Sequence, residues 1–139
     1  MKPHSVMLAQ INRAARTIAP ASAGAAATRT IRAIDRQRAT PSAAVYVAWD
    51  MHGRCRYVGS VRRPRSRTAV RDRVREHFAK YPDRRANWYA LTILPLRDDL
   101  DIDQVRMCEG WVAYVLNPLE GSAHPVIAPD HTLVRAFAA

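Results

Sequence analysis

The chain has 139 residues and carries 22 Lys and Arg against 12 Asp and Glu, which gives a net charge of +10 and a pI near 10.8. This length suits one domain with an extension. The charge points to a polyanionic partner, most often nucleic acid, with a merely basic ribosome-associated or interaction protein as the alternative. No run of about 18 apolar residues is present, so we expect no membrane span. The two cysteines lack metal-ligand spacing, so we expect no zinc site, and a reduced, cytoplasmic compartment is the default. If the protein is bacterial, we expect it to be associated with the nucleoid.

Residues 1–41 form a basic, Ala-rich extension. The first 40 residues hold seven Lys and Arg against one acid. Apolar residues recur at helical spacing from Met7 to Ile18, and a second, weaker helix is predicted over Thr28–Arg38. Three interpretations remain open: a flexible basic arm, a helical extension that binds nucleic acid, or, for residues 1–34, an organellar transit peptide.

The main domain is expected over residues 42–120 and begins with a β-hairpin. Its predicted strands are Val45–Trp49 and Arg54–Val61, joined by a tight turn. A symmetric four-residue loop would place Tyr46 directly opposite Tyr57. Directly opposed side chains of an antiparallel pair share one face, so the two phenols would meet on one surface of the hairpin.

The middle of the chain is its most basic part. Residues 54–85 carry twelve Lys and Arg against three acids. A loop interrupted by Pro64 leads into a helix predicted over Ala69–Tyr81, with Thr68 as N-cap. We expect salt-sensitive, sequence-independent contacts with phosphates from this region. The arginines proposed for this grip are Arg62, Arg63, Arg65, Arg67, Arg71 and Arg75.

A strand is predicted over Trp88–Leu96 and a helix over Ile102–Leu116, which follows acidic residues suited to a helix start. Residues 121–139 are expected to form a tail that packs on the domain. The fold class is therefore α/β, an α+β sandwich. It has a small three-stranded antiparallel sheet flanked by helices in the order β-β-α-β-α.

Four sequence features together resemble the GIY-YIG nuclease family. They are Tyr46, then Tyr57-Val58-Gly59, then Arg73 four residues before His77, then Glu109 inside the last helix. The resemblance covers about residues 43–118, and the predicted order of elements agrees with that family. Two positions differ from it. Ala44 stands where the first motif has glycine, and Gly121 stands where many members have asparagine.

The resemblance implies a metal-dependent endonuclease that hydrolyses phosphodiester bonds, with DNA favoured over RNA as substrate. Glu109 would bind Mg²⁺ or Mn²⁺, and Arg73 would stabilise charge on the phosphate. Tyr46 and Tyr57 would manage the attacking water, with His77 as base, relay or phosphate ligand. Gly59 suits a place where the backbone approaches a ligand or side chain closely.

Two alternatives stay open. The tyrosines could be a packing pair on a catalytically inactive nucleic-acid-binding module, or the chain could be a basic interaction protein. We expect a monomer or weak dimer that either has low sequence preference by itself or is targeted by a partner protein.

Overall fold

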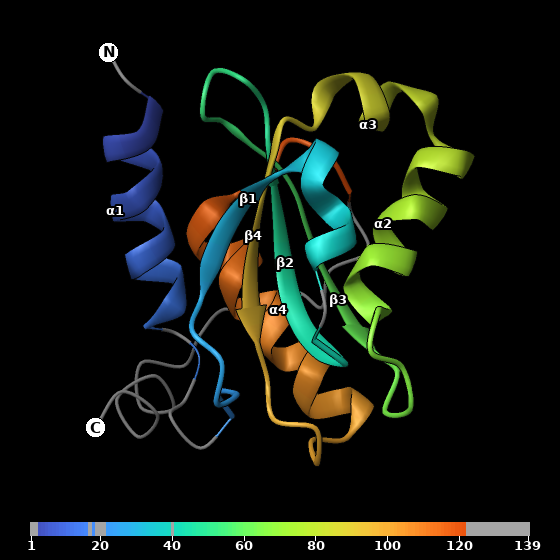
Figure 1. Ribbon diagram of the computed structural model, residues 1–139. Coiled ribbons are helices and arrows are strands. Elements are labelled where there is room, and N and C mark those ends of the chain that lie inside the picture. Colours follow the sequence, from blue (N-terminus) through green and yellow to red (C-terminus); the bar gives the residue numbers. More distant parts are fainter. Residues whose placement is uncertain (1–2, 17, 19–21, 40, 122–139) are drawn as a thin grey trace.

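The computed structural model describes residues 3–16, 18, 22–39 and 41–121 of the chain (Figure 1). Within these residues the fold is mixed α/β, with a four-stranded antiparallel sheet in the order β1-β4-β2-β3 and helices on both faces. In chain order the elements are α1 (Pro3–Ala15), β1 (Arg29–Arg32), the 3₁₀ helix η1 (Ala33–Arg38), β2 (Ala43–Trp49), β3 (Cys55–Arg62), α2 (Ala69–Lys80), α3 (Pro82–Asn87), β4 (Ala90–Pro95) and α4 (Ile102–Leu116).

The sheet separates two apolar layers. Strand β2 is buried along its whole length, and its side chains alternate between the two layers, as the period of a strand requires. Val45 and Val47 pack with α1 and α4, whereas Tyr46 and Ala48 pack with α2 and η1. Strand β2 lies between β4 and β3, and β3 forms one edge of the sheet.

The prediction of a helix over residues 28–38 is wrong, and so is the prediction of three strands. Arg29–Arg32 is a strand that pairs with β4, and the chain then turns into η1. Thr30 and Thr92 lie opposite each other, and their hydroxyl oxygens form a hydrogen bond of 2.8 Å. The edge of β4 therefore provides partners that outweigh a weak local helix preference. The helix predicted over 7–18 is confirmed in its overlap with α1, where Ile11 and Ala14 are buried.

The predicted register of the hairpin is wrong by two residues. Tyr46 lies opposite Gly59, and Tyr57 lies opposite Ala48, with a bulge at the end of β2. The cause is a longer turn organised by Asp50. Its carboxylate accepts hydrogen bonds from the backbone N–H groups of residues 52 and 54 and from the Arg54 side chain. The shift is even, so both tyrosines still lie on the same face.

Helices α2 and α4 agree closely with the prediction from the sequence. Helix α2 begins after Thr68 as predicted, although the Thr68 hydroxyl donates to Asp72 instead of accepting from the backbone. Helix α4 has the predicted bounds and starts with a capping box between Asp101 and Gln104. In the described part of the chain, no helix is long and apolar enough to cross a membrane. The predicted tail beyond residue 121 lies outside the described residues.

Candidate active site

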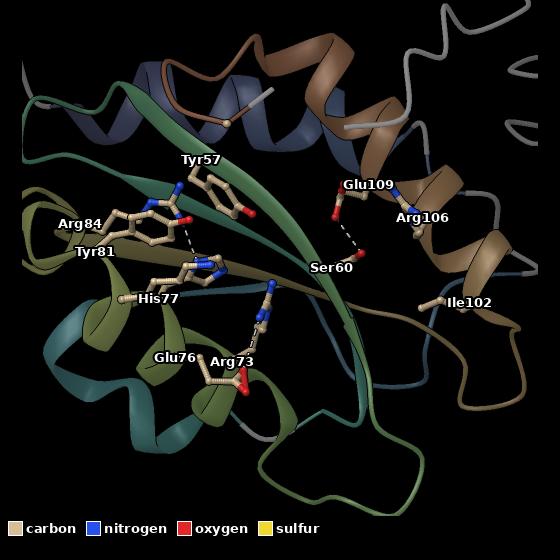
Figure 2. A pocket seen from close by; sticks show the side chains of 12 residues that line it. Tyr57, Ser60, Arg73, Glu76, His77, Tyr81, Arg84, Ile102, Arg106 and Glu109 are labelled. Atoms are coloured by element: carbon tan, nitrogen blue, oxygen red, sulfur yellow. Dashed lines mark hydrogen bonds and ion pairs between the residues drawn. The ribbon is translucent and has the colours of Figure 1, made fainter. Parts of the chain in front are cut away.

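A cleft of about 610 Å³ opens at the β3 edge of the sheet, between α2 and α4 (Figure 2). It is bordered by elements from both faces of the sheet. Its walls are dominated by charged and hydroxyl-bearing side chains, which suits a polar ligand better than an apolar one. The lining residues are Tyr57, Ser60, Arg73, Glu76, His77, Lys80, Tyr81, Arg84, Ile102, Arg106, Glu109 and Gly121.

Gly59 allows two tyrosine rings to lie against the backbone of β3. A Cβ atom at this position would lie 2.5 Å from Oη of Tyr46 and 2.7 Å from Cε1 of Tyr57, closer than van der Waals contact allows. The two ring centroids are 6.2 Å apart. Tyr46 is fully buried, whereas Tyr57 is half-buried and lines the cleft. The glycine is therefore explained by the close packing of the two phenols.

Behind the cleft, Tyr46 and His77 form a short hydrogen bond. Oη of Tyr46 lies 2.6 Å from Nε2 of His77, and Nδ1 of the same ring lies 2.7 Å from Nη1 of Arg84. Burial, helped by the positive charges of Arg73 and Arg84, lowers the pKa of His77 to about 4. The imidazole is therefore neutral at pH 7.

Burial also raises the pKa of both phenols. For Tyr46 the neighbouring Tyr57 adds to this effect, while the charge and hydrogen bond of Arg73 oppose it. For Tyr57 the negative charge of Glu109 adds to the effect, and Arg84 and Arg73 oppose it. Burial thus keeps each phenol protonated at pH 7, while nearby guanidinium groups offset part of the rise in its pKa.

Arg73 and Glu109 reach the cleft from opposite walls (Figure 2). On α2, Val70 and Val74 turn toward the sheet, which leaves Arg73 on the cleft side of the helix. Its guanidinium lies close enough to Tyr46 to oppose the rise in the pKa of that phenol, and lies 3.6 Å from Glu76. On α4, Glu109 is partly buried, and its Oε1 accepts a hydrogen bond of 2.8 Å from the hydroxyl of Ser60.

The donor set around Glu109 is compatible with Mg²⁺. Among the described residues no group of three or more His, Cys, Asp or Glu side chains could hold a metal ion. Magnesium does not need such a cage, because it keeps several waters and is often bound through one or two carboxylates together with substrate phosphates. Glu109, with the Ser60 hydroxyl beside it, presents hard oxygen atoms at the wall of a polar cleft. The other carboxylate that lines the cleft, Glu76, is paired with Arg63 and Arg73, so Glu109 is the better candidate to hold such a cation.

Of the five residues predicted to be catalytic, four line the cleft and the fifth, Tyr46, lies directly behind it. The six arginines predicted to bind phosphates are not among the residues that line the cleft. Arg62 donates to the carbonyl of Leu100, Arg63 pairs with Glu76, and Arg71 pairs with Asp72. The remaining three are partly or fully exposed on the loop before α2 and on α2 itself, namely Arg65, Arg67 and Arg75.

Sequence reasoning did not single out several residues that shape the cleft. The most connected is Arg84 of α3, whose side chain is 13% exposed and lies 3.6 Å from Glu120. It also lies over the rings of Tyr57 and Tyr81. In the sequence Arg84 is one of many arginines, and no local pattern distinguishes it. Its role depends on partners that only the fold brings together.

Comparison with models of protein families, with curated proteins and with solved structures finds no match for this chain.

Proposed function

We propose that the protein is a metal-dependent nuclease that hydrolyses phosphodiester bonds, with DNA as the favoured substrate. The observation that carries the proposal is the convergence of Arg73 and Glu109 on one cleft, beside Tyr57 and His77. These residues come from α2, β3 and α4, so their meeting is a property of the fold and not of sequence proximity. A guanidinium facing a carboxylate across a polar cleft can hold a phosphate and a cation together. The resemblance to GIY-YIG nucleases supports the same interpretation.

In the proposed reaction, the oxygen of a water molecule forms a bond to phosphorus and the bond to the leaving oxygen breaks. Arg73 binds the phosphate in bidentate fashion and stabilises the charge that builds on its oxygens. Tyr57, the phenol that lines the cleft, orients the attacking water. The buried hydroxyl group of Tyr46 lies behind the cleft near Arg73 and is hydrogen-bonded to His77. Tyr57 takes up the water's proton as its own phenolic proton passes to solvent in the cleft, and the leaving oxygen takes a proton from solvent.

Glu109 would hold the divalent cation, which when bound would polarise a phosphate oxygen and stabilise the leaving oxygen. Ser60 keeps the Glu109 carboxylate turned toward the cleft. The exposed arginines Arg65, Arg67 and Arg75 would contact neighbouring phosphates without reading sequence.

Incubation of the purified protein with supercoiled plasmid and with single-stranded DNA, in Mg²⁺ or EDTA, tests the proposal. We expect nicking in Mg²⁺, none in EDTA, and none by Glu109→Gln in either. Asp103→Asn is the matched control, because Asp103 is an exposed carboxylate in the first turn of the same helix. Nicking that Glu109→Gln retains would refute the role of Glu109. Salt-sensitive binding without cleavage would favour an inactive binding module, and neither binding nor cleavage would favour a basic interaction protein.

A further inference from the structure

The hydrogen bonds around His77 determine which of its ring nitrogens carries the proton. Nδ1 lies 2.7 Å from Nη1 of Arg84. A guanidinium has five N–H donors and no acceptor, so Nδ1 must accept this bond and must be unprotonated. The same geometry excludes the doubly protonated ring, whose Nδ1–H would face an N–H of Arg84. His77 is therefore neutral and carries its proton on Nε2.

The tautomer sets the direction of the next hydrogen bond. Nε2 lies 2.6 Å from Oη of Tyr46, and both groups are buried. Since Nε2 carries the proton, His77 donates and Tyr46 accepts. Burial raises the pKa of Tyr46, and the nearby Arg73 guanidinium opposes that rise. The hydrogen bond from His77 and the charge of Arg73 therefore both act in favour of the phenolate form.

We propose that Arg84 is a positioning residue that locks His77 as a hydrogen-bond donor to Tyr46, so that His77 supports the phenol and does not act as a base toward it. This proposal rests on the proposed function only where it concerns turnover. The lock itself is a property of the folded protein.

Arg84 is itself held firmly in place. It lies 3.6 Å from Glu120, which also accepts a hydrogen bond from the indole N–H of Trp88, and the guanidinium lies 4.1 Å from the centroid of the Tyr81 ring. It is 13% exposed, so water competes little for its N–H groups. A donor fixed in this way holds one tautomer more strictly than a mobile surface arginine would.

Several other titratable or charged groups surround His77. Arg73 and Glu76 lie on its own helix, Tyr46 comes from β2, Tyr57 comes from β3, and Arg84 comes from α3. Of these, Arg84 is the group hydrogen-bonded to Nδ1. Changing Arg84 should therefore change the tautomer, whereas changing an arginine that does not touch the ring should not.

Long-range ¹⁵N–¹H NMR of the imidazole tests the lock without any activity assay. For the wild-type protein at pH 7 we expect a protonated Nε2 and an unprotonated Nδ1. Arg84→Met keeps the apolar stem but removes the donor, so the other tautomer should become populated. Arg84→Lys keeps a donor-only group and should restore the wild-type pattern. Arg85→Met, the neighbouring exposed arginine of α3, should leave the pattern unchanged. A protonated Nδ1 in the wild type, or no change in Arg84→Met, would overturn the proposal.

The second test measures DNA cleavage. Gln can place an N–H donor near the position of Nε2 but cannot accept and pass on a proton as a base. If His77 only donates, His77→Gln should stay within about tenfold of the wild-type rate. His77→Leu, which lacks the donor, should fall by about 10- to 100-fold further. Equal losses in the two variants would assign base catalysis to His77 and refute its role as donor. A protein inactive in every form would refute the proposed nuclease, while the NMR result would still decide the lock.

Discussion

Replacement of Gly59 by alanine tests the packing of the site most simply, because the structure fixes even the sign of the effect. In an ordinary strand, alanine in place of glycine would stabilise the fold by roughly 0.5–1 kcal/mol, since it restricts the unfolded chain. Here the new Cβ would lie 2.5 Å from Cζ and Oη of Tyr46 and 2.7 Å from Tyr57. Neither ring moves freely, because Tyr46 is hydrogen-bonded to His77 and Tyr57 stacks on Trp88.

Overpacking of this kind costs about 1–3 kcal/mol. After the gain of roughly 0.5–1 kcal/mol is subtracted, we expect a net loss of about 1 kcal/mol in the free energy of unfolding, and a melting temperature lower by about 3–5 °C. Circular dichroism during thermal and urea unfolding measures both quantities. Tyr46→Leu removes the two closest atoms, so the Gly59→Ala change should cost at least about 1 kcal/mol less in that background. A neutral or stabilising Gly59→Ala substitution would refute the explanation of this glycine.

Three further predictions concern pH and salt. Although burial opposes it, the hydrogen bonds from Arg54 and the backbone lower the pKa of Asp50, so its stabilisation is present at pH 7 and is lost as the pH falls through that lowered value. Asp50→Asn should therefore be less stable than the wild type by about 1–3 kcal/mol at pH 7, with a smaller gap in acid; a gap independent of pH would contradict this. Because the pKa of His77 falls from 6.5 to about 4 on folding, the unfolded chain binds this proton first, and stability should decline from pH 6.5 to 4 by up to about 3 kcal/mol. His77→Gln should remove that decline, and an unchanged profile would show that other groups cause it. DNA binding should weaken about tenfold or more between 50 and 200 mM salt, as measured by fluorescence anisotropy, and salt-independent binding would argue against phosphate contacts.

The sequence predicted those elements whose signals are local. Helix α4 has a capping residue at Asp101 and an apolar stripe of its own, and both are visible without the fold. Strand β1 has no such local signal. Thr30 and Ile31 form a strand because they pair with the edge of β4. The prediction of the hairpin register was wrong for a related reason. The carboxylate of Asp50 accepts two backbone N–H groups, and this lengthens the turn beyond the simplest loop.

The residues of the candidate site also differ in whether the sequence alone could identify them. Arg73 and His77 could be placed on one helix face from their spacing alone. Glu109 stood out because it is a carboxylate within an apolar helix. Glu76 and Arg84 could not be recognised, because Arg63, Glu120 and the ring of Tyr81 reach them only through the tertiary structure. Charged residues in a basic chain carry little information until their partners are known.

Separate measurements of DNA binding and DNA cleavage test the role of Arg73 most directly. We would measure the single-turnover rate of Mg²⁺-dependent DNA cleavage and the dissociation constant for the same DNA, in the wild type, Arg73→Ala and Arg75→Ala. We expect Arg73→Ala to lose about 100-fold or more in rate and less than about threefold in binding, because the contact of Arg73 with the phosphate strengthens in the transition state. Arg75→Ala, which removes an exposed guanidinium of the same helix outside the cleft lining, should weaken binding more than rate. Equal losses in rate and binding for Arg73→Ala would show that Arg73 only grips the phosphate, and no cleavage by the wild type would refute the proposed nuclease activity.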